Sequence, residues 1–371
     1  METKTIEENN TGTVIIEDNA SNENSAGGTQ IIGETGTQII NEGGTQIIEE
    51  SQPVSQEPVN SVSQVVRLNG APLANDVEVL GYKIKNQMNT RSGEADLYLA
   101  EKNSITYVFK YYRNSHKPKS AVVEKIKNLK NPHIVKLFDY GFYNDRFFEV
   151  YEYAKAGNVN ARKKDGTLKY LPLSEEELLK LCKDIVESFN EFHQAGIIHR
   201  DIKPDNFLLR NTNPLDIIIG DFGIASVMDE GEELHKTKTQ HHTIGYVPRE
   251  FFTADYKGIG TGIDYYALGI TLWEFATGGN PFVNPKTGAA RNENHIMRDT
   301  FEGRLADDLL SREPKLSPKL QKLIRGLLVT DYEKRWGYSE VTRYLNGEDV
   351  EVTETEKRKL KVSVLGQNYE D

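Results

Sequence analysis

The chain has 371 residues, a length that allows one large or two ordinary domains. It carries a net charge of −11 and has one cysteine. The single cysteine excludes an intramolecular disulfide and predicts a reducing, cytoplasmic setting. Because the sequence has neither an apolar run of about 18 residues nor an apolar N-terminal signal core, we expect no membrane association.

The acidic charge is concentrated in residues 1–77. This segment has twelve acidic and two basic residues and none of the chain's 34 aromatic residues. Without large apolar groups it cannot offset the entropy of ordering its backbone, so we expect a disordered acidic tail. The remaining residues carry a net charge of only −1, and this distribution argues against nucleic acid as a partner.

The tail repeats one short phrase. Gly-Thr-Gln-Ile-Ile occurs three times within residues 27–50, and residues 12–16 are a near copy. In every copy an isoleucine stands three residues after a threonine. The four threonines are Thr13, Thr29, Thr37 and Thr45.

Residues from about 77 to 153 alternate apolar and polar side chains, as half-buried antiparallel strands do. A short helical stretch, residues 120–130, interrupts the pattern. The predicted strands lie within residues 77–86, 95–103, 105–112, 134–144 and 146–153.

After about residue 155 the apolar period becomes helical. In residues 173–196, Ser174 and Glu177 form a predicted capping box, and Gly196 stands where a helix ends. Cys182 falls on the apolar face of this helix, so we expect a buried thiol. Further helices are predicted within residues 262–278 and 317–331. The sequence thus predicts an α+β protein of two lobes with a cleft between them, where ligands commonly bind.

Two motifs follow the capped helix. "HRDIKPDN" occupies residues 199–206, and "DFG" begins at Asp221, fifteen residues after Asn206. In this combination and spacing the sequence resembles the eukaryotic-like (Hanks-type) serine/threonine protein kinases over residues 78–350. The resemblance implies an N-lobe at 78–154 and a C-lobe at 155–350, leaving residues 351–371 as a C-terminal tail.

The resemblance also implies roles in γ-phosphoryl transfer from ATP to protein substrates. Asp201 would accept the proton of the substrate hydroxyl, and Lys203 would lie near the transferring phosphate. Asn206 and Asp221 would hold Mg²⁺, which favours such sparse oxygen ligands. Lys110, at the end of "YVFK", would contact the α- and β-phosphates.

The sequence departs from the family pattern at two places. Of the three glycines expected in the nucleotide-covering loop, only Gly93 is present, and it is out of register. Glu124 is the only acidic residue in the short helix, whereas an ungapped count places Val122 where the partner of Lys110 belongs. We expect a shortened helix that lets Glu124 pair with Lys110. Loss of the pair would indicate weak or regulated activity.

Around the adenine, the resemblance implies a hinge formed by Glu152 and Ala154 after Tyr151, which would narrow the back pocket. Arg200 suggests a basic pocket for a phosphorylated activation loop, with Thr237 and Thr239 as candidate sites. The inert alternative is that these two threonines have no regulatory role.

Four further residues match the activation segment and its supports. Lys203 together with Thr243 is the pattern of serine/threonine kinases. Glu250 would pair with Arg335, and Asp264 would brace the catalytic loop. Both supports are scaffold roles.

The leading hypothesis is an active serine/threonine kinase, and the alternative is a pseudokinase scaffold with weak or no phosphotransfer. A small-molecule kinase is disfavoured by "GYVPRE". Forkhead-associated domains read phosphothreonine together with the third following residue. We therefore interpret the tail threonines as autophosphorylation sites that dock such domains. The alternatives for the tail are β-pairing and an inert linker.

Overall fold

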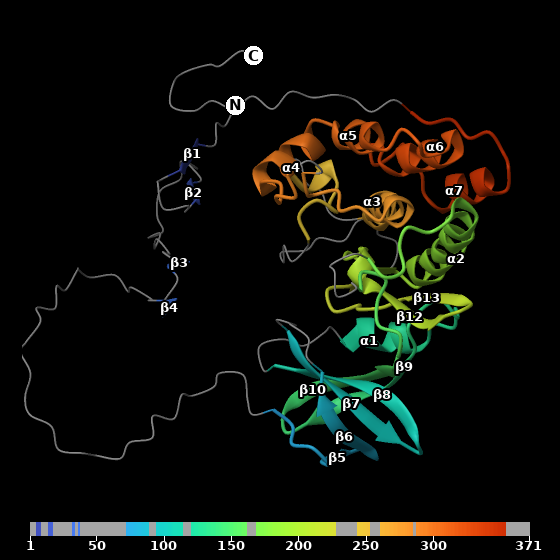
Figure 1. Ribbon diagram of the computed structural model, residues 1–371. Helices are drawn as coiled ribbons and strands as arrows, with labels where there is room; N and C mark the ends of the chain where they lie inside the picture. The colour runs from blue at the N-terminus through green and yellow to red at the C-terminus, as the bar shows by residue number, and fades with distance from the viewer. Residues whose placement is uncertain are drawn as a thin grey trace, which may run out of the picture. The chain divides into compact units, whose positions relative to one another are not determined.

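A computed structural model of the chain describes residues 72–88, 94–113, 120–161, 168–227, 243–252, 260–284 and 287–353, with the backbone of four short strands within residues 5–37. Residues 67–360 form one compact unit with a strand-rich and a helix-rich lobe (Figure 1). The α+β two-lobe architecture expected from the sequence is confirmed.

The four N-terminal strands pair locally. Strand β1 (Thr5–Glu8) is antiparallel to β2 (Val14–Glu17), and β3 (Ile32–Gly33) is antiparallel to β4 (Gly36–Thr37). Of the repeat threonines, Thr37 ends β4, whereas the other three lie outside the described residues.

The strand-rich lobe is one antiparallel sheet of six strands in the order β5-β6-β7-β8-β10-β9. The strands are β5 (Glu78–Val79), β6 (Tyr82–Gln87), β7 (Ala95–Lys102), β8 (Ile105–Tyr112), β9 (Leu137–Tyr143) and β10 (Arg146–Glu152). Each expected strand segment contains one of these strands, and the turn at residues 80–81 divides the first segment into β5 and β6.

The two faces of this sheet differ because side chains alternate along each strand. On one face Phe109 of β8 stacks on Phe148 of β10, with ring centroids 4.8 Å apart, inside the small core of the lobe. The opposite face therefore receives Lys110 and Glu149, which are cross-strand partners. Helix α1 (Ser120–Lys127) buries Val122, Val123 and Ile126 in the main core.

The helix-rich lobe begins with the predicted capped helix. The Ser174 hydroxyl accepts a hydrogen bond from the Glu177 backbone N–H, and the Glu177 carboxylate accepts one from the Ser174 backbone. This reciprocal cap satisfies two backbone donors that a helix start leaves unpaired. The helices are α2 (Glu175–Gln194), α3 (Gly262–Thr277), α4 (Glu293–Phe301), α5 (Leu305–Arg312), α6 (Pro318–Leu327) and α7 (Tyr338–Leu345).

Short strands between α2 and α3 carry the two motifs. Strand β11 (Ile197–Ile198) pairs with β14 (Ser226–Val227), and β12 (Phe207–Thr212) forms a hairpin with β13 (Leu215–Ile219). The 3-10 helices are η1 (Pro204–Asn206), which leads into β12, and η2 (Arg249–Phe252). These pairings hold the loops after β11 and β13 against one buried core that also includes α2 and α3. No helix in the described ranges is long and apolar enough to cross a membrane.

Candidate active site

The carboxylate of Asp201 is surrounded by three side chains of the motifs. The Lys203 ammonium lies 2.7 Å from Oδ2, the Asn206 amide nitrogen donates to the same oxygen at 2.8 Å, and the Thr243 hydroxyl donates to Oδ1 at 3.0 Å. Lys203 also donates to the Thr243 hydroxyl at 2.8 Å. The structure therefore brings together four residues that the sequence separates by up to 42 positions.

The backbone of the loop that carries Asp201 is held by hydrogen bonds to Asp264, which is fully buried in α3. Its two oxygens accept the backbone N–H groups of His199, at 2.9 Å, and Arg200, at 2.8 Å. Arg200 has a φ of +72°, a left-handed conformation that is costly for a residue with a side chain. The sequence-predicted brace is thus formed by two hydrogen bonds that hold a strained backbone.

His199 connects the loops of the two motifs. Its Nε2 lies 2.9 Å from the carbonyl oxygen of Gly220, and its ring contacts Phe222 with centroids 4.6 Å apart. Both rings are buried. The position of Asp221, between Gly220 and Phe222, is therefore coupled to the catalytic loop through packing and one hydrogen bond.

Lys110 and Asp221 form an ion pair of 2.9 Å, Nζ to Oδ1. The positive charge of Lys110 lowers the pKa of Asp221 to about 2, even though the surrounding protein partly desolvates this carboxylate, whose side chain is still 56% exposed. Burial alone would lower the pKa of Lys110, but the charges of Asp221 and Glu149 outweigh it and keep the pKa above its ordinary value. Both groups are therefore charged at neutral pH.

The residues present fit a nucleotide with Mg²⁺. A Cβ added at Gly223 would meet the Lys110 ammonium at 3.1 Å and Asp221 Oδ1 at 3.2 Å, so the glycine keeps open the space in front of both charges. Asp221 supplies an ionised oxygen donor of the kind that Mg²⁺ prefers. Since the amide nitrogen of Asn206 donates to Asp201, its amide oxygen is the atom suited to a cation.

The expected pair of Glu124 with Lys110 is not formed. Glu124 is exposed, and its carboxylate accepts a hydrogen bond from the Tyr140 hydroxyl on β9. Two residues along a helix rotate a side chain by about 200°, so the burial of Val122 against the core turns Glu124 away from Lys110. The sequence expectation for Glu124 is thus corrected.

The hinge segment is tied to the helix-rich lobe by its side chains. The Glu152 carboxylate forms a two-bond pair with the Arg210 guanidinium of β12, both bonds at 2.8 Å. The Ala154 carbonyl accepts the Gly157 N–H at 3.1 Å, and Tyr151 is half-buried behind the hinge. The Glu152 side chain is therefore committed to Arg210, and the part of the hinge backbone in binding adenine stays a prediction.

In the described part of the activation segment, two arginines make the contacts that hold its ends. The Arg335 guanidinium pairs with both oxygens of Glu250, at 2.7 and 3.0 Å. Arg200 is buried and donates from Nη1 to the Ile224 carbonyl at 3.2 Å. Gly93, Thr237 and Thr239 lie outside the described residues.

Two acidic residues near Lys110 were not predicted from the sequence. Glu149, on β10, is 2% exposed and stands opposite Lys110 in the strand register. Glu94 places Oε2 only 2.9 Å from the Cβ position at Gly223, so it borders the same space. The available signal for Glu149 was an acidic residue that interrupts the aromatic and apolar residues 147–151 of β10.

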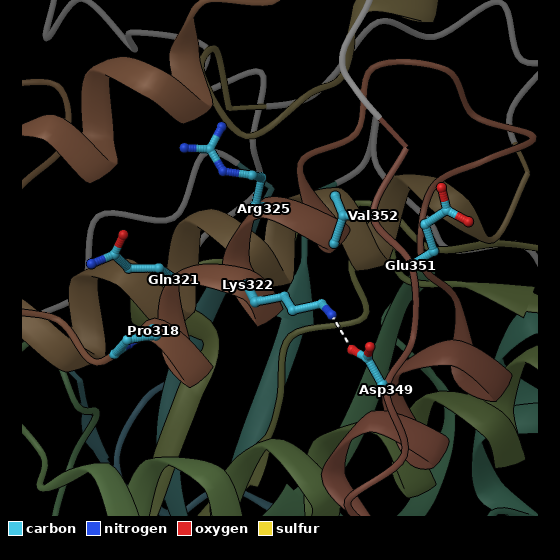
Figure 2. Close-up of a pocket in the computed structure, with 7 residues that line it drawn as sticks. All are labelled: Pro318, Gln321, Lys322, Arg325, Asp349, Glu351 and Val352. Carbon is cyan, nitrogen blue, oxygen red and sulfur yellow. Dashed lines mark hydrogen bonds and ion pairs between the residues drawn. The ribbon is translucent and has the colours of Figure 1, made fainter.

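A separate surface pocket lies on α6 and the segment after α7 (Figure 2). It has a volume of about 700 Å³ and is lined mainly by polar and charged side chains. Across it Lys322 pairs with Asp349, as the dashed line shows. None of its lining residues belongs to the motifs, so it is distinct from the Asp201 site.

Comparison with known proteins decides the family. A model of the protein kinase domain family matches residues 91–345. The chain belongs to the protein kinase domain family. The match covers the strand-rich lobe from β7 onward and the helix-rich lobe to the end of α7, including Lys110, Asp201 and Asp221.

Several kinases of other organisms are similar to this kinase domain. A calcium/calmodulin-dependent protein kinase of Metarhizium anisopliae is 26% identical over 268 residues, 71% of this chain and 64% of that protein. Serine/threonine-protein kinase GIN4 of Saccharomyces cerevisiae is 31% identical over 212 residues, 57% of this chain and 17% of that protein. Serine/threonine-protein kinase shk1/pak1 of Schizosaccharomyces pombe is 27% identical over 260 residues, 68% of this chain and 37% of that protein. The chain thus spans less than two thirds of the length of these relatives.

Proposed function

We propose that the protein is an ATP- and Mg²⁺-dependent kinase that phosphorylates serine and threonine hydroxyls of proteins. The observation that supports it best is the cluster of Lys203, Asn206 and Thr243 around Asp201, with the Lys110–Asp221 pair near the same loops. A non-catalytic binding module has no chemical need for this whole set.

Each residue has a role that follows from its charge and place. Asp201 accepts the proton as the substrate oxygen bonds to the γ-phosphorus and the bond to the β-phosphate oxygen breaks. Lys203 stabilises the charge of the transferring group, and Lys110 binds the α- and β-phosphates. Asp221 and Asn206 would hold Mg²⁺, which would supply positive charge to the leaving diphosphate.

Thr243 supports the choice of serine and threonine as acceptors. Its hydroxyl donates to Asp201 and accepts from Lys203, so its own side chain occupies the space beside the proposed base. A tyrosine hydroxyl extends farther from its own backbone and would need a deeper approach.

The test incubates the full chain with γ-labelled ATP, Mg²⁺ and a generic basic protein, beside the Asp201→Asn variant. We expect label on serine or threonine with the unchanged chain and a loss of at least 100-fold in the variant. Absence of label in both would favour a pseudokinase scaffold. The supporting observations for that alternative are the incomplete glycine loop and the bond of Glu124 to Tyr140 instead of Lys110.

The tail repeats extend this proposal. A tail tethered to its own kinase domain meets the site at high effective concentration. Thr13, Thr29, Thr37 and Thr45 are its candidate autophosphorylation sites, each with isoleucine at the third following position. The phosphorylated repeats would dock forkhead-associated-domain proteins, and several repeats on one chain would bind with avidity.

Phosphopeptide mass spectrometry tests the tail. Phosphate on the repeat threonines in the unchanged chain, and none in Asp201→Asn, would support autophosphorylation. The second candidate, β-pairing, is favoured by the β1–β2 and β3–β4 pairs. It predicts unmodified threonines and pairing of the repeats as strands, within one chain or between chains.

The cytoplasm, with its reduced thiols, is the compartment that the single cysteine supports.

A further inference from the structure

Lys110 requires a counter-charge that remains when the nucleotide site is used. In the structure its direct partner is Asp221, at 2.9 Å. Asp221 is also the proposed Mg²⁺ ligand, and a metal ion draws charge away from any other partner of that carboxylate. Glu124, the glutamate of α1, points toward Tyr140 instead. With Glu124 turned away, a further buried acid beside Lys110 would hold its ammonium in place when Asp221 binds the metal ion.

Glu149 occupies the required position. It is the direct cross-strand partner of Lys110 in the β8–β10 ladder, so both side chains leave the sheet on the same face. The Phe109–Phe148 stack on the opposite face fixes this alternation. Lys110 and Glu149 are 8% and 2% exposed, and a buried carboxylate with a neighbouring buried ammonium is far less costly than either charge alone.

A tyrosine holds the Glu149 carboxylate in place. The Tyr112 hydroxyl donates to Oε2 at 2.8 Å, and Tyr151, two residues further along β10, leaves the sheet on the same face as Glu149. The Lys110 ammonium lies 5.1 Å from the centre of the Tyr112 ring, so that ring contacts both charges. Burial raises the pKa of Glu149, while the Lys110 charge and the Tyr112 hydrogen bond oppose the rise.

We propose that Glu149 replaces the helix glutamate as the residue that positions Lys110 for the nucleotide phosphates. Two departures from the family pattern accompany each other. The apolar Val122 packs where the helix acid is expected, and an acid, Glu149, stands in the sheet opposite the lysine. Glu149 is a positioning residue, because it acts through Lys110. The inference rests on the proposed use of ATP.

Glu94 is the alternative candidate. Its carboxylate borders the space in front of Gly223. It directly follows residues 89–93, the loop expected to cover the phosphates, and it is only half-buried. A negative group in that space competes with phosphate, whereas Glu149 stands beside Lys110 on the neighbouring strand. Glu149 is therefore the better counter-charge.

The test measures the affinity of the full chain for a non-hydrolysable MgATP analogue and for adenosine by titration calorimetry. Adenosine lacks the phosphates that Lys110 contacts. We expect Glu149→Gln to weaken the analogue about tenfold, the effect of losing one charge-assisted phosphate contact, and to change adenosine affinity less than twofold. Glu101→Gln, an exposed glutamate of the same sheet, is the matched control and should change neither affinity.

The remaining outcomes are each decisive. An equal loss of both affinities would mean a structural role and would overturn the proposal, as would a selective loss that follows Glu124→Gln or Glu94→Gln instead. If Glu149→Gln does not fold, Tyr112→Phe decides: a three- to fivefold selective loss supports the proposal, and an unchanged ratio contradicts it. Because only binding is measured, a chain that binds the analogue but transfers no phosphate contradicts the proposed function and leaves this test intact.

Discussion

Replacing Asp264 by asparagine should remove one backbone hydrogen bond of the catalytic loop, and the resulting loss in the free energy of unfolding can be worked out from the structure. The carboxylate accepts the N–H groups of His199 and Arg200 on separate oxygens, and His193 Nε2 lies 2.9 Å from the first of these oxygens. An amide offers only one oxygen, so one backbone N–H would face an NH₂ group in a fully buried site. An unsatisfied buried donor costs about 1–3 kcal/mol.

The strained backbone makes the loop prone to move once this brace is weakened. Arg200, at φ +72°, stores about 1–3 kcal/mol that the Asp264 hydrogen bond holds in place, and relaxation would carry the loop away from its braced position. From the unsatisfied donor we expect Asp264→Asn to lower the free energy of unfolding by about 1–3 kcal/mol and the Tm by roughly 2–12 °C. Since Arg200 directly precedes Asp201, the proposed phosphotransfer should fall about 10- to 100-fold in kcat.

Urea denaturation followed by tryptophan fluorescence measures this change. Both tryptophans, Trp273 and Trp336, are buried in the helix-rich lobe and report its unfolding. Asp349→Asn is the matched control, because the Asp349 carboxylate is 94% exposed. A loss of less than about 0.5 kcal/mol in Asp264→Asn, within the range of ordinary surface substitutions, would refute the reasoning about the brace.

Three further predictions concern other parts of the structure. Arg335→Leu should cost about 3–5 kcal/mol, because it leaves Glu250 without its two-bond partner, and adding Glu250→Leu should recover part of the loss in the same denaturation assay. Burial raises the pKa of Cys182 to about 12, so labelling by Ellman's reagent at pH 8 should proceed only as fast as the chain unfolds, and rapid labelling of native protein would contradict this burial. The lowered pKa of Asp221 contributes stability that is present above the ordinary pKa of 3.8 and is lost as the pH falls toward about 2. The stability difference between the unchanged chain and Lys110→Met should therefore be complete at pH 6 and shrink between pH 4 and 2; a difference that is independent of pH would exclude the ion pair as its source.

The sequence predicted those parts of the site that local motifs determine. Asp201, Lys203 and Asn206 fall within six consecutive residues, and one turn with a 3-10 helix brings them together. The capping box of α2 was equally accessible, because Ser174 and Glu177 are three residues apart and need only a helix between them.

The partner of Lys110 could not be predicted from any single segment of the sequence, because it is set by how separate segments pack. Whether Glu124 faces the lysine is set by the rotation of α1, and this rotation follows from burying Val122 and Ile126 against the core. The place of Glu149 follows from the register of β8 with β10, where a shift of one residue would turn it to the other face. Pairing registers between strands 37 residues apart are set by packing, so the sequence pattern alone could not supply them.

The central claim, phosphotransfer through Asp201, is tested most directly by single-turnover transfer of labelled γ-phosphate to a serine- and threonine-containing protein. The same preparations should be titrated with a non-hydrolysable MgATP analogue. We predict that Asp201→Asn binds the analogue within about twofold of the unchanged chain while transfer falls by two to four orders of magnitude. Equal transfer by both proteins, or none by the unchanged chain despite analogue binding, would contradict the account.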